Sequence, residues 1–125
     1  MIVAISPKKS TLIVVRHSPY GSSLARASID AALAHAAFGQ PVDLLFMGDG
    51  VLQLLPCQDS SAIDARNIGR LLASLPMYDI DSIYIDARAA AHYKLDISQV
   101  PLDARPLENA ELHQLMAQYD HLMGF

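Results

Sequence analysis

The chain has 125 residues, of which 52% are hydrophobic and 18% are charged. This length and apolar content predict one folded domain and exclude intrinsic disorder. The formal net charge is −4 and the nine Lys and Arg residues are scattered, so we expect no direct binding to a nucleic-acid backbone, which requires clustered basic side chains.

The cysteine and histidine content limits the chemistry of the chain. Cys57 is its only cysteine, which excludes an internal disulfide and favours a reducing compartment. The five histidines show neither HxH nor HExxH spacing, and we expect no metal and no cofactor. The apolar run at residues 1–5 is too short for a signal sequence, and no stretch is long enough to cross a bilayer. We therefore predict a cytoplasmic protein without membrane association.

The first part of the chain predicts two strands and a helix. Residues 1–10 are interpreted as an N-terminal extension and residues 11–125 as a single domain. The continuous β-branched run at 11–16 is typical of a strand buried on both faces. An Ala-rich helix is expected at 24–38, and a second strand at 41–47.

The rest of the chain continues this alternation. In order, we predict a short helical segment at 51–55, a helix at 62–75, a strand at 82–86, a short helix at 87–92, a short strand near Ala104, a helix at 109–119 and a strand at 121–125. Strands that alternate with helices form right-handed crossovers and a mainly parallel sheet covered on both faces. We therefore predict the α/β class, as a three-layer α/β/α sandwich of the flavodoxin-like type.

Four segments together resemble the TusC/DsrF family, which belongs to the TusBCD (DsrEFH) sulfur-relay proteins. They match the family pattern in order and spacing from about residue 11 to residue 125. The segments are Pro19–Ser22, Gly50–Gln58 (GVxQLLPxQ in the family), Met77–Ile80 (LYDI in the family), and Pro106–Glu108 followed by Tyr119-Asp120 and Phe125.

The resemblance implies the DsrE-like fold and a hetero-oligomer with TusB-like and TusD-like subunits. In that family the complex relays persulfide sulfur toward 2-thiouridine at the tRNA wobble position, whereas DsrEFH relatives serve dissimilatory sulfur oxidation. Both roles stay open for this chain. We also expect it to self-associate when it is produced without its partners.

The resemblance also indicates that this chain does not carry sulfur itself. The sulfur-carrying subunit of the family places its cysteine just after the third strand, and Asp86 stands at that position here. A carboxylate cannot hold a sulfane sulfur, because a thiolate is the required nucleophile. Cys57 remains as the alternative. It is either an incidental small apolar side chain or, with a cation or helix N-terminus nearby, a persulfide-bearing sulfurtransferase site.

Arg16, His17, Ser22 and Ser23 surround the first strand-to-helix turn. Ligands of open α/β sheets bind at this end of the strands, where free N–H groups and cations can hold an anion. These residues are therefore candidates for an anion-binding or small-molecule-binding module. The simpler alternative is that the serines cap the helix, and the chain lacks the Gly-rich phosphate-binding fingerprints.

A polar set surrounds the third strand, consisting of Asp79, Asp81, Asp86, Arg88 and His92. Paired carboxylates perform acid–base chemistry only when they are held close together and partly desolvated. We interpret the set as a solvated edge or the rim of an interface.

Two apolar parts of the sequence, the segment at 51–55 and the Ala-rich helix, contain candidates for contact surfaces. Val51, Leu52, Leu54 and Leu55 carry more apolar surface than one helical turn buries internally, which predicts either an interface with a partner or a core lid over the sheet. His35 lies within the Ala-rich helix and is interpreted as a packed or interface side chain rather than a ligand.

Overall fold

The computed structural model describes residues 10–17, 24–54, 73–80, 82–99 and 104–125. Within these ranges the strands form one five-stranded sheet with the order β4-β3-β2-β1-β5. The strands are β1 (Thr11–Val15), β2 (Val42–Phe46), β3 (Ile83–Asp86), β4 (Ala104–Leu107) and β5 (His121–Gly124). Every neighbouring pair is parallel, so the predicted parallel sheet is confirmed.

The α-helices of the described ranges and the segment at 48–54 agree closely with the prediction, whereas two short 3-10 helices at 75–78 and 97–99 were not predicted. The helices are α1 (Leu24–Ala37), α3 (Ala87–His92) and α4 (Asn109–Ala117), with the 3-10 helices η1 (Gly48–Leu54), η2 (Leu75–Tyr78) and η3 (Ile97–Gln99). The helix predicted at 62–75 falls mostly outside the described residues. Residues 73 and 74 are helical, and η2 continues from them.

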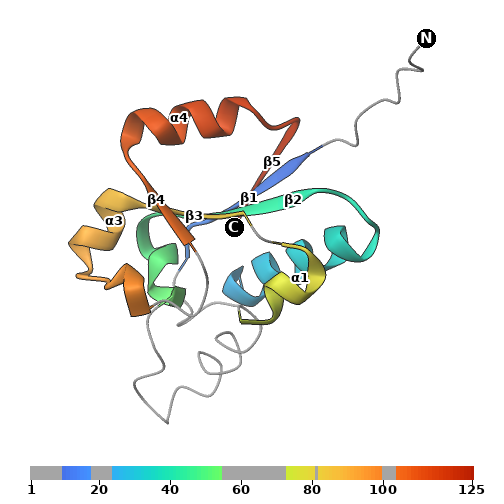
Figure 1. Ribbon diagram of the computed structural model, residues 1–125, viewed down its shortest axis with the longest axis horizontal. Helices are drawn as coiled ribbons and strands as arrows, with labels where there is room; N and C mark the ends of the chain where they lie inside the picture. Colours follow the sequence, from blue (N-terminus) through green and yellow to red (C-terminus); the bar gives the residue numbers. More distant parts are fainter. Residues whose placement is uncertain (1–9, 18–23, 55–72, 81, 100–103) are drawn as a thin grey trace.

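The helices lie on both faces of the sheet, which confirms the predicted three-layer α/β/α architecture. Figure 1 shows α4 over one face and α1 on the opposite side. The 3-10 helices η1 and η2 and the short helix α3 pack on the α1 side, because their buried side chains share one core cluster with those of α1. All five residues of β1 are buried, as expected for a strand covered from both sides.

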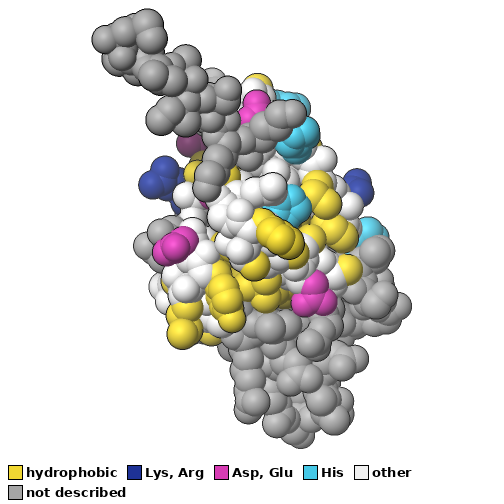
Figure 2. Space-filling model, turned by 90° about the vertical axis from the view of Figure 1, so that its right-hand side faces the viewer, with side chains coloured by type: hydrophobic (Ala, Val, Ile, Leu, Met, Phe, Trp, Pro, Cys, Tyr) yellow, Lys and Arg dark blue, Asp and Glu magenta, His cyan; other side chains and the backbone are white. Residues whose placement is uncertain are grey.

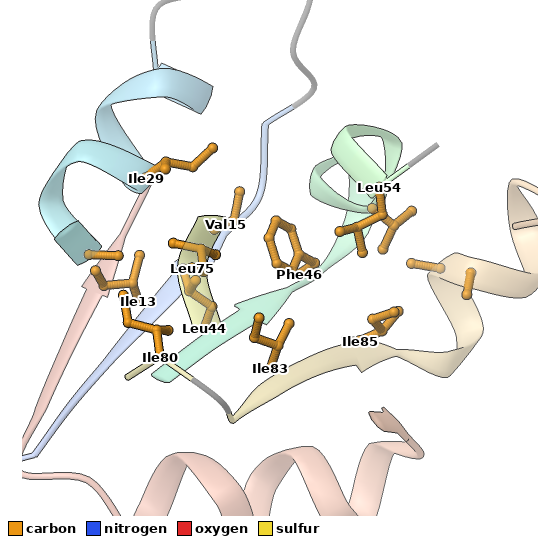
Figure 3. Close-up of a cluster of buried hydrophobic side chains, with 14 of the residues drawn as sticks. Ile13, Val15, Ile29, Leu44, Phe46, Leu54, Leu75, Ile80, Ile83 and Ile85 are labelled. Carbon is orange, nitrogen blue, oxygen red and sulfur yellow. The ribbon is translucent and has the colours of Figure 1, made fainter. Parts of the chain in front are cut away.

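Two apolar clusters hold the layers together. The larger cluster fills the space between the sheet and α1, and Figure 3 shows Leu44 and Phe46 among its side chains, with Ile13 at one side. The smaller cluster lies beneath α4 and includes Leu12 and Leu45 from the sheet. Each fully buried side chain of this size contributes about 1.5–3 kcal/mol relative to an exposed one. Together they fix the strand ends that position the candidate site.

The ends of α4 are fixed by polar contacts. A capping box joins Glu108 and Glu111 at its start, where Glu108 N donates to Glu111 Oε1 at 3.1 Å. Beyond its end, the Tyr119 hydroxyl donates to Asp43 Oδ2 on β2. Burial, followed by this hydrogen bond, raises the pKa of Tyr119 above its ordinary value. The residues leading into β5 are therefore anchored to the middle of the sheet.

Candidate functional site at the carboxyl ends of the strands

All five strands are parallel, so their carboxyl ends meet at one edge of the sheet. From β1 the chain adds β2, β3 and β4 toward one side, and β5 then returns to pair with β1 on the other side. The strand order therefore reverses between β1 and β5. Open α/β sheets bind ligands in the crevice at such a switch point.

Arg16 and His17 directly follow the last residue of β1, at this switch point. Arg16 N donates to the backbone oxygen of Phe125 at 2.8 Å, and Phe125 N donates to Val14 O at 2.9 Å. The guanidinium of Arg16 lies over Gly124, where an added Cβ would meet its Nη2 at 3.1 Å. Arg16 and His17 are exposed. This corner therefore presents two exposed side chains that can carry positive charge.

Gln53 is a residue of this corner that sequence reasoning missed. Its side chain is only 4% exposed, and Nε2 donates to the backbone oxygen of His17 at 2.9 Å. Because the backbone oxygen of His17 is an acceptor, the amide atom that faces it is the donor Nε2. The amide oxygen Oε1 of Gln53 is then buried without a hydrogen-bond partner in the described structure. An unpaired buried acceptor costs about 1–3 kcal/mol. The signal available in the sequence was one amide inside an otherwise apolar segment.

Gly50 brings η1 against the end of β1. Gly50 N donates to Met47 O at 2.8 Å, and Met47 N donates to Val15 O at 2.9 Å. A Cβ at position 50 would lie 2.6 Å from the carbonyl carbon of Val15 and still closer to its oxygen. Only glycine fits this close approach of two backbones.

The apolar segment predicted as an interface or a core lid is divided by the structure. Val51 and Leu54 are fully buried in the larger core cluster, where they pack as a lid over the strand ends. Leu52 is half-buried. Leu55 lies outside the described residues. Within the described part of this segment, Leu52 is the apolar side chain that reaches the surface.

Asp49 and Tyr93 join η1 to the end of α3. The Tyr93 hydroxyl donates to Asp49 Oδ1. This hydrogen bond is the main cause that raises the pKa of Tyr93, which stays protonated at neutral pH. The His92 ring stands edge-on to the Tyr93 ring, with centroids 4.8 Å apart and an interplanar angle of 82°. These contacts line the β2–β3 part of the same sheet edge.

Asp86 ends β3 and caps α3. Its backbone is extended and Oδ1 accepts a hydrogen bond from Arg88 N at 3.1 Å. A carboxylate in this position satisfies one of the free N–H groups of the first helical turn. The position that the resemblance assigns to a sulfur-carrying cysteine is thus occupied by a helix-capping carboxylate.

The polar set predicted around the third strand does not form one cluster. Asp79 is the C-cap of η2 in a left-handed conformation with φ 64°, and it precedes the amino end of β3. Asp86 is the last residue of β3, and Arg88 and His92 follow it on α3. Arg88 and His92 are exposed, and Asp81 lies outside the described residues.

The remaining predicted residues lie elsewhere. Cys57, Ser22 and Ser23 fall outside the described residues. His35 lies near the end of α1, with Nδ1 2.9 Å from Ala31 O, and it lines a groove at the amino end of the sheet. Within the described ranges, no three His, Cys, Asp or Glu side chains gather as a metal site requires, and no helix is long and apolar enough to cross a membrane.

Comparison with known protein families matches residues 9–125 to the model of the DsrE/DsrF-like family. The chain belongs to the DsrE/DsrF-like family. This DsrE/DsrF-like chain is 34% identical over 115 residues to a protein TusC homolog of Pseudomonas aeruginosa, covering 92% of this chain and 97% of that one.

Two solved structures are similar to this DsrE/DsrF-like chain in fold. The ychN protein of E. coli superposes with a TM-score of 0.79 at 20% identity, over 94% of this chain and 99% of that one. A conserved protein of unknown function from Bacteroides thetaiotaomicron gives a TM-score of 0.65 at 10% identity, over 92% and 94% of the two chains. The predicted family and fold class are confirmed.

Proposed function

We propose that this chain is a sulfur-relay subunit that works by assembly and does not itself carry the sulfur. The family and the 34% identity to a TusC homolog support a role beside TusB-like and TusD-like subunits. We further propose that the single domain 11–125 acts in the cytoplasm. The pathway is 2-thiolation of the tRNA wobble uridine, and dissimilatory sulfur oxidation is the alternative to be tested.

The observation that carries the non-carrier role is the Asp86 cap. A relay residue must take up a sulfane sulfur on a thiolate and then pass it on to an acceptor. The Asp86 carboxylate offers no thiol, and its Oδ1 is engaged with Arg88 N at 3.1 Å. The side chain at the relay position therefore has a structural task, which is to hold the start of α3.

Exposed apolar side chains support a role in assembly. Phe38, Met77, Tyr78 and Leu122 are large hydrophobic residues that are at least half exposed. Met77 and Tyr78 lie on η2, within the segment that resembles the family pattern. Neighbouring exposed apolar side chains, such as Met77 and Tyr78, are typical of a surface that contacts another protein chain.

The test is reconstitution with TusB-like and TusD-like partners in cells that lack the native subunits. The proposal predicts that the three chains co-purify, and that the Cys57→Ser variant assembles and restores 2-thiouridine in digested tRNA. Loss of thiolation in Cys57→Ser with assembly intact would show instead that Cys57 carries the sulfur. Assembly without any effect on tRNA would favour the sulfur-oxidation role.

A further inference from the structure

β5 is an edge of the sheet, and its outer side is open to solvent. Within the described residues, β5 pairs with β1 alone. His121 N donates to the oxygen of Ser10, the residue before β1, at 3.1 Å, so the backbone groups of His121 face β1. Successive residues of a strand direct their N–H and C=O groups to opposite sides, so Leu122 and Gly124 direct theirs away from β1. Leu122 is 51% exposed and Gly124 is also exposed.

The two edges of the sheet differ in how they are protected. β4, the opposite edge, contains Arg105 and Pro106, and both are exposed. A charged side chain and a proline, which has no N–H to donate, are common means of keeping an edge strand from pairing with another chain. β5 has the sequence His-Leu-Met-Gly, with no proline and no Lys, Arg, Asp or Glu residue. β5 is therefore the edge that can accept a further strand.

A groove with apolar walls accompanies the β5 edge. It has a volume of about 650 Å³ and lies between β5 and the last turn of α1. Phe38 and Leu122 are among its lining residues, and none of the described lining residues is a Lys, Arg, Asp or Glu. Figure 2 shows hydrophobic side chains beside histidines on one face of the molecule. Apolar surface next to an open strand adds hydrophobic contact to the backbone hydrogen bonds that an incoming strand makes.

The spacing of the outward groups on β5 is complementary to itself. In an antiparallel pair, two residues that lie opposite each other exchange both backbone hydrogen bonds, and the next such pair lies two residues away. When Leu122 lies opposite Gly124 of a second copy, a twofold axis also places Gly124 opposite Leu122 of that copy. Gly124 has no side chain, which leaves room for the facing Leu122. We propose that β5 joins two copies of this chain in an antiparallel pair centred on Met123, which makes one continuous sheet.

The charges near the edge are compatible with this arrangement. The guanidinium of Arg16 lies over Gly124. The residue that faces Gly124 in the proposed pair is the apolar Leu122 of the second copy, so the two Arg16 side chains do not face each other. A second copy is the occupant that the edge itself specifies, because its donors and acceptors have the required spacing. The pairing gives a structural basis for the expected self-association, and it does not depend on the sulfur relay.

Analytical ultracentrifugation of the full chain, produced without partner subunits, tests the pairing. The proposal predicts a dimer whose fraction increases with protein concentration. Leu122→Pro removes an outward N–H and should weaken dimerisation about tenfold or more relative to Leu122→Ala, which keeps that N–H. Leu122→Lys should also weaken it, whereas Ala91→Lys, at an exposed position on α3, should not. A chain that stays monomeric at millimolar concentration, or equal dimerisation of Leu122→Pro and Leu122→Ala, would overturn the proposal.

A disulfide cross-link provides a second measurement that requires no change at Leu122. In an antiparallel pair, the opposite residues that lie between two hydrogen-bonded pairs have α-carbons about 4.5 Å apart, a distance that a disulfide can span. In a Cys57→Ser background, Met123→Cys should therefore form a covalent dimer under mild oxidation. His113→Cys, at an exposed position on α4, should form far less. No cross-link at position 123, or equal yields at positions 113 and 123, would contradict the pairing.

Discussion

Gly50 packs its α-carbon against the carbonyl group of Val15. This contact places η1 directly on the end of β1, and a Cβ at position 50 would lie 2.6 Å from the carbonyl carbon. The two residues are 35 positions apart, and no side chain mediates the contact. Gly50 opens the segment that resembles the family pattern, and it is glycine there because a larger residue would not fit against Val15.

Gly50→Ala should destabilise the chain by about 1–3 kcal/mol, because η1 must move away from the strand end to admit a methyl group. Urea unfolding followed by circular dichroism measures the change. Gly124→Ala is the matched control, since the atoms nearest to its Cβ belong to the flexible Arg16 side chain, the closest at 3.1 Å. A Gly50 variant as stable as the Gly124 variant would mean that the two backbones do not approach so closely.

Substitutions of Gln53 should distinguish the contribution of its shape to stability from the contribution of its hydrogen bond. Gln53→Glu keeps the shape but places a buried carboxylate oxygen against His17 O, so we expect a loss of about 2 kcal/mol at neutral pH. Burial raises the pKa of the introduced acid, so stability should be regained as the pH falls and the acid becomes protonated. Gln53→Leu removes the unpaired Oε1 as well as the donor, and should cost less than the Glu variant. Unfolding curves at pH 5 and pH 8 give the comparison, and a Glu variant insensitive to pH would contradict it.

Tyr119→Phe should reduce the dependence of stability on alkaline pH. The raised pKa of the Tyr119 hydroxyl means that its contribution is complete below the unfolded-state pKa near 10 and is lost as the pH rises further. The side chain is partly exposed, so we expect no more than about 1 kcal/mol. Denaturant unfolding at pH 8 and above pH 10 should show a larger loss in the parent chain than in Tyr119→Phe. Tyr78→Phe, at an exposed position on η2, is the control and should behave as the parent.

Asp86→Ala should lower stability by about 1 kcal/mol, whereas Asp86→Asn should be nearly neutral, because an amide oxygen can also accept from Arg88 N. Thermal unfolding measures both variants. If the carboxylate only caps α3, the Asn variant also keeps tRNA thiolation in the reconstituted complex. Loss of thiolation in a fully stable Asn variant would assign a chemical task to the carboxylate.

The strands and most helices could be predicted because their signals are local. The β-branched run at 11–16 and the apolar stripe at 109–119 report burial through periodicity alone. The contacts of the site are not local. Gln53 meets His17 across 36 positions, and Tyr119 meets Asp43 across 76. Periodicity carries no information on such pairs.

The candidate residues show the same division. Sequence spacing placed Arg16 and His17 correctly at a strand end, because that position follows from the end of a buried run. Sequence spacing also grouped Asp79 with Asp86, because both are close to β3 in the sequence. In the structure these two residues lie at opposite ends of that strand. Whether Val51 and Leu54 pack as a lid over the core depends on the turn that follows β2. Their hydrophobicity alone predicts a core lid and a partner interface equally well.

Mass spectrometry of this chain within the assembled complex tests the non-carrier role most directly. After incubation with a persulfide donor, the account predicts an unchanged mass for this subunit and a gain of one sulfur atom on a partner. A gain of one sulfur atom on this chain that disappears in Cys57→Ser would contradict it.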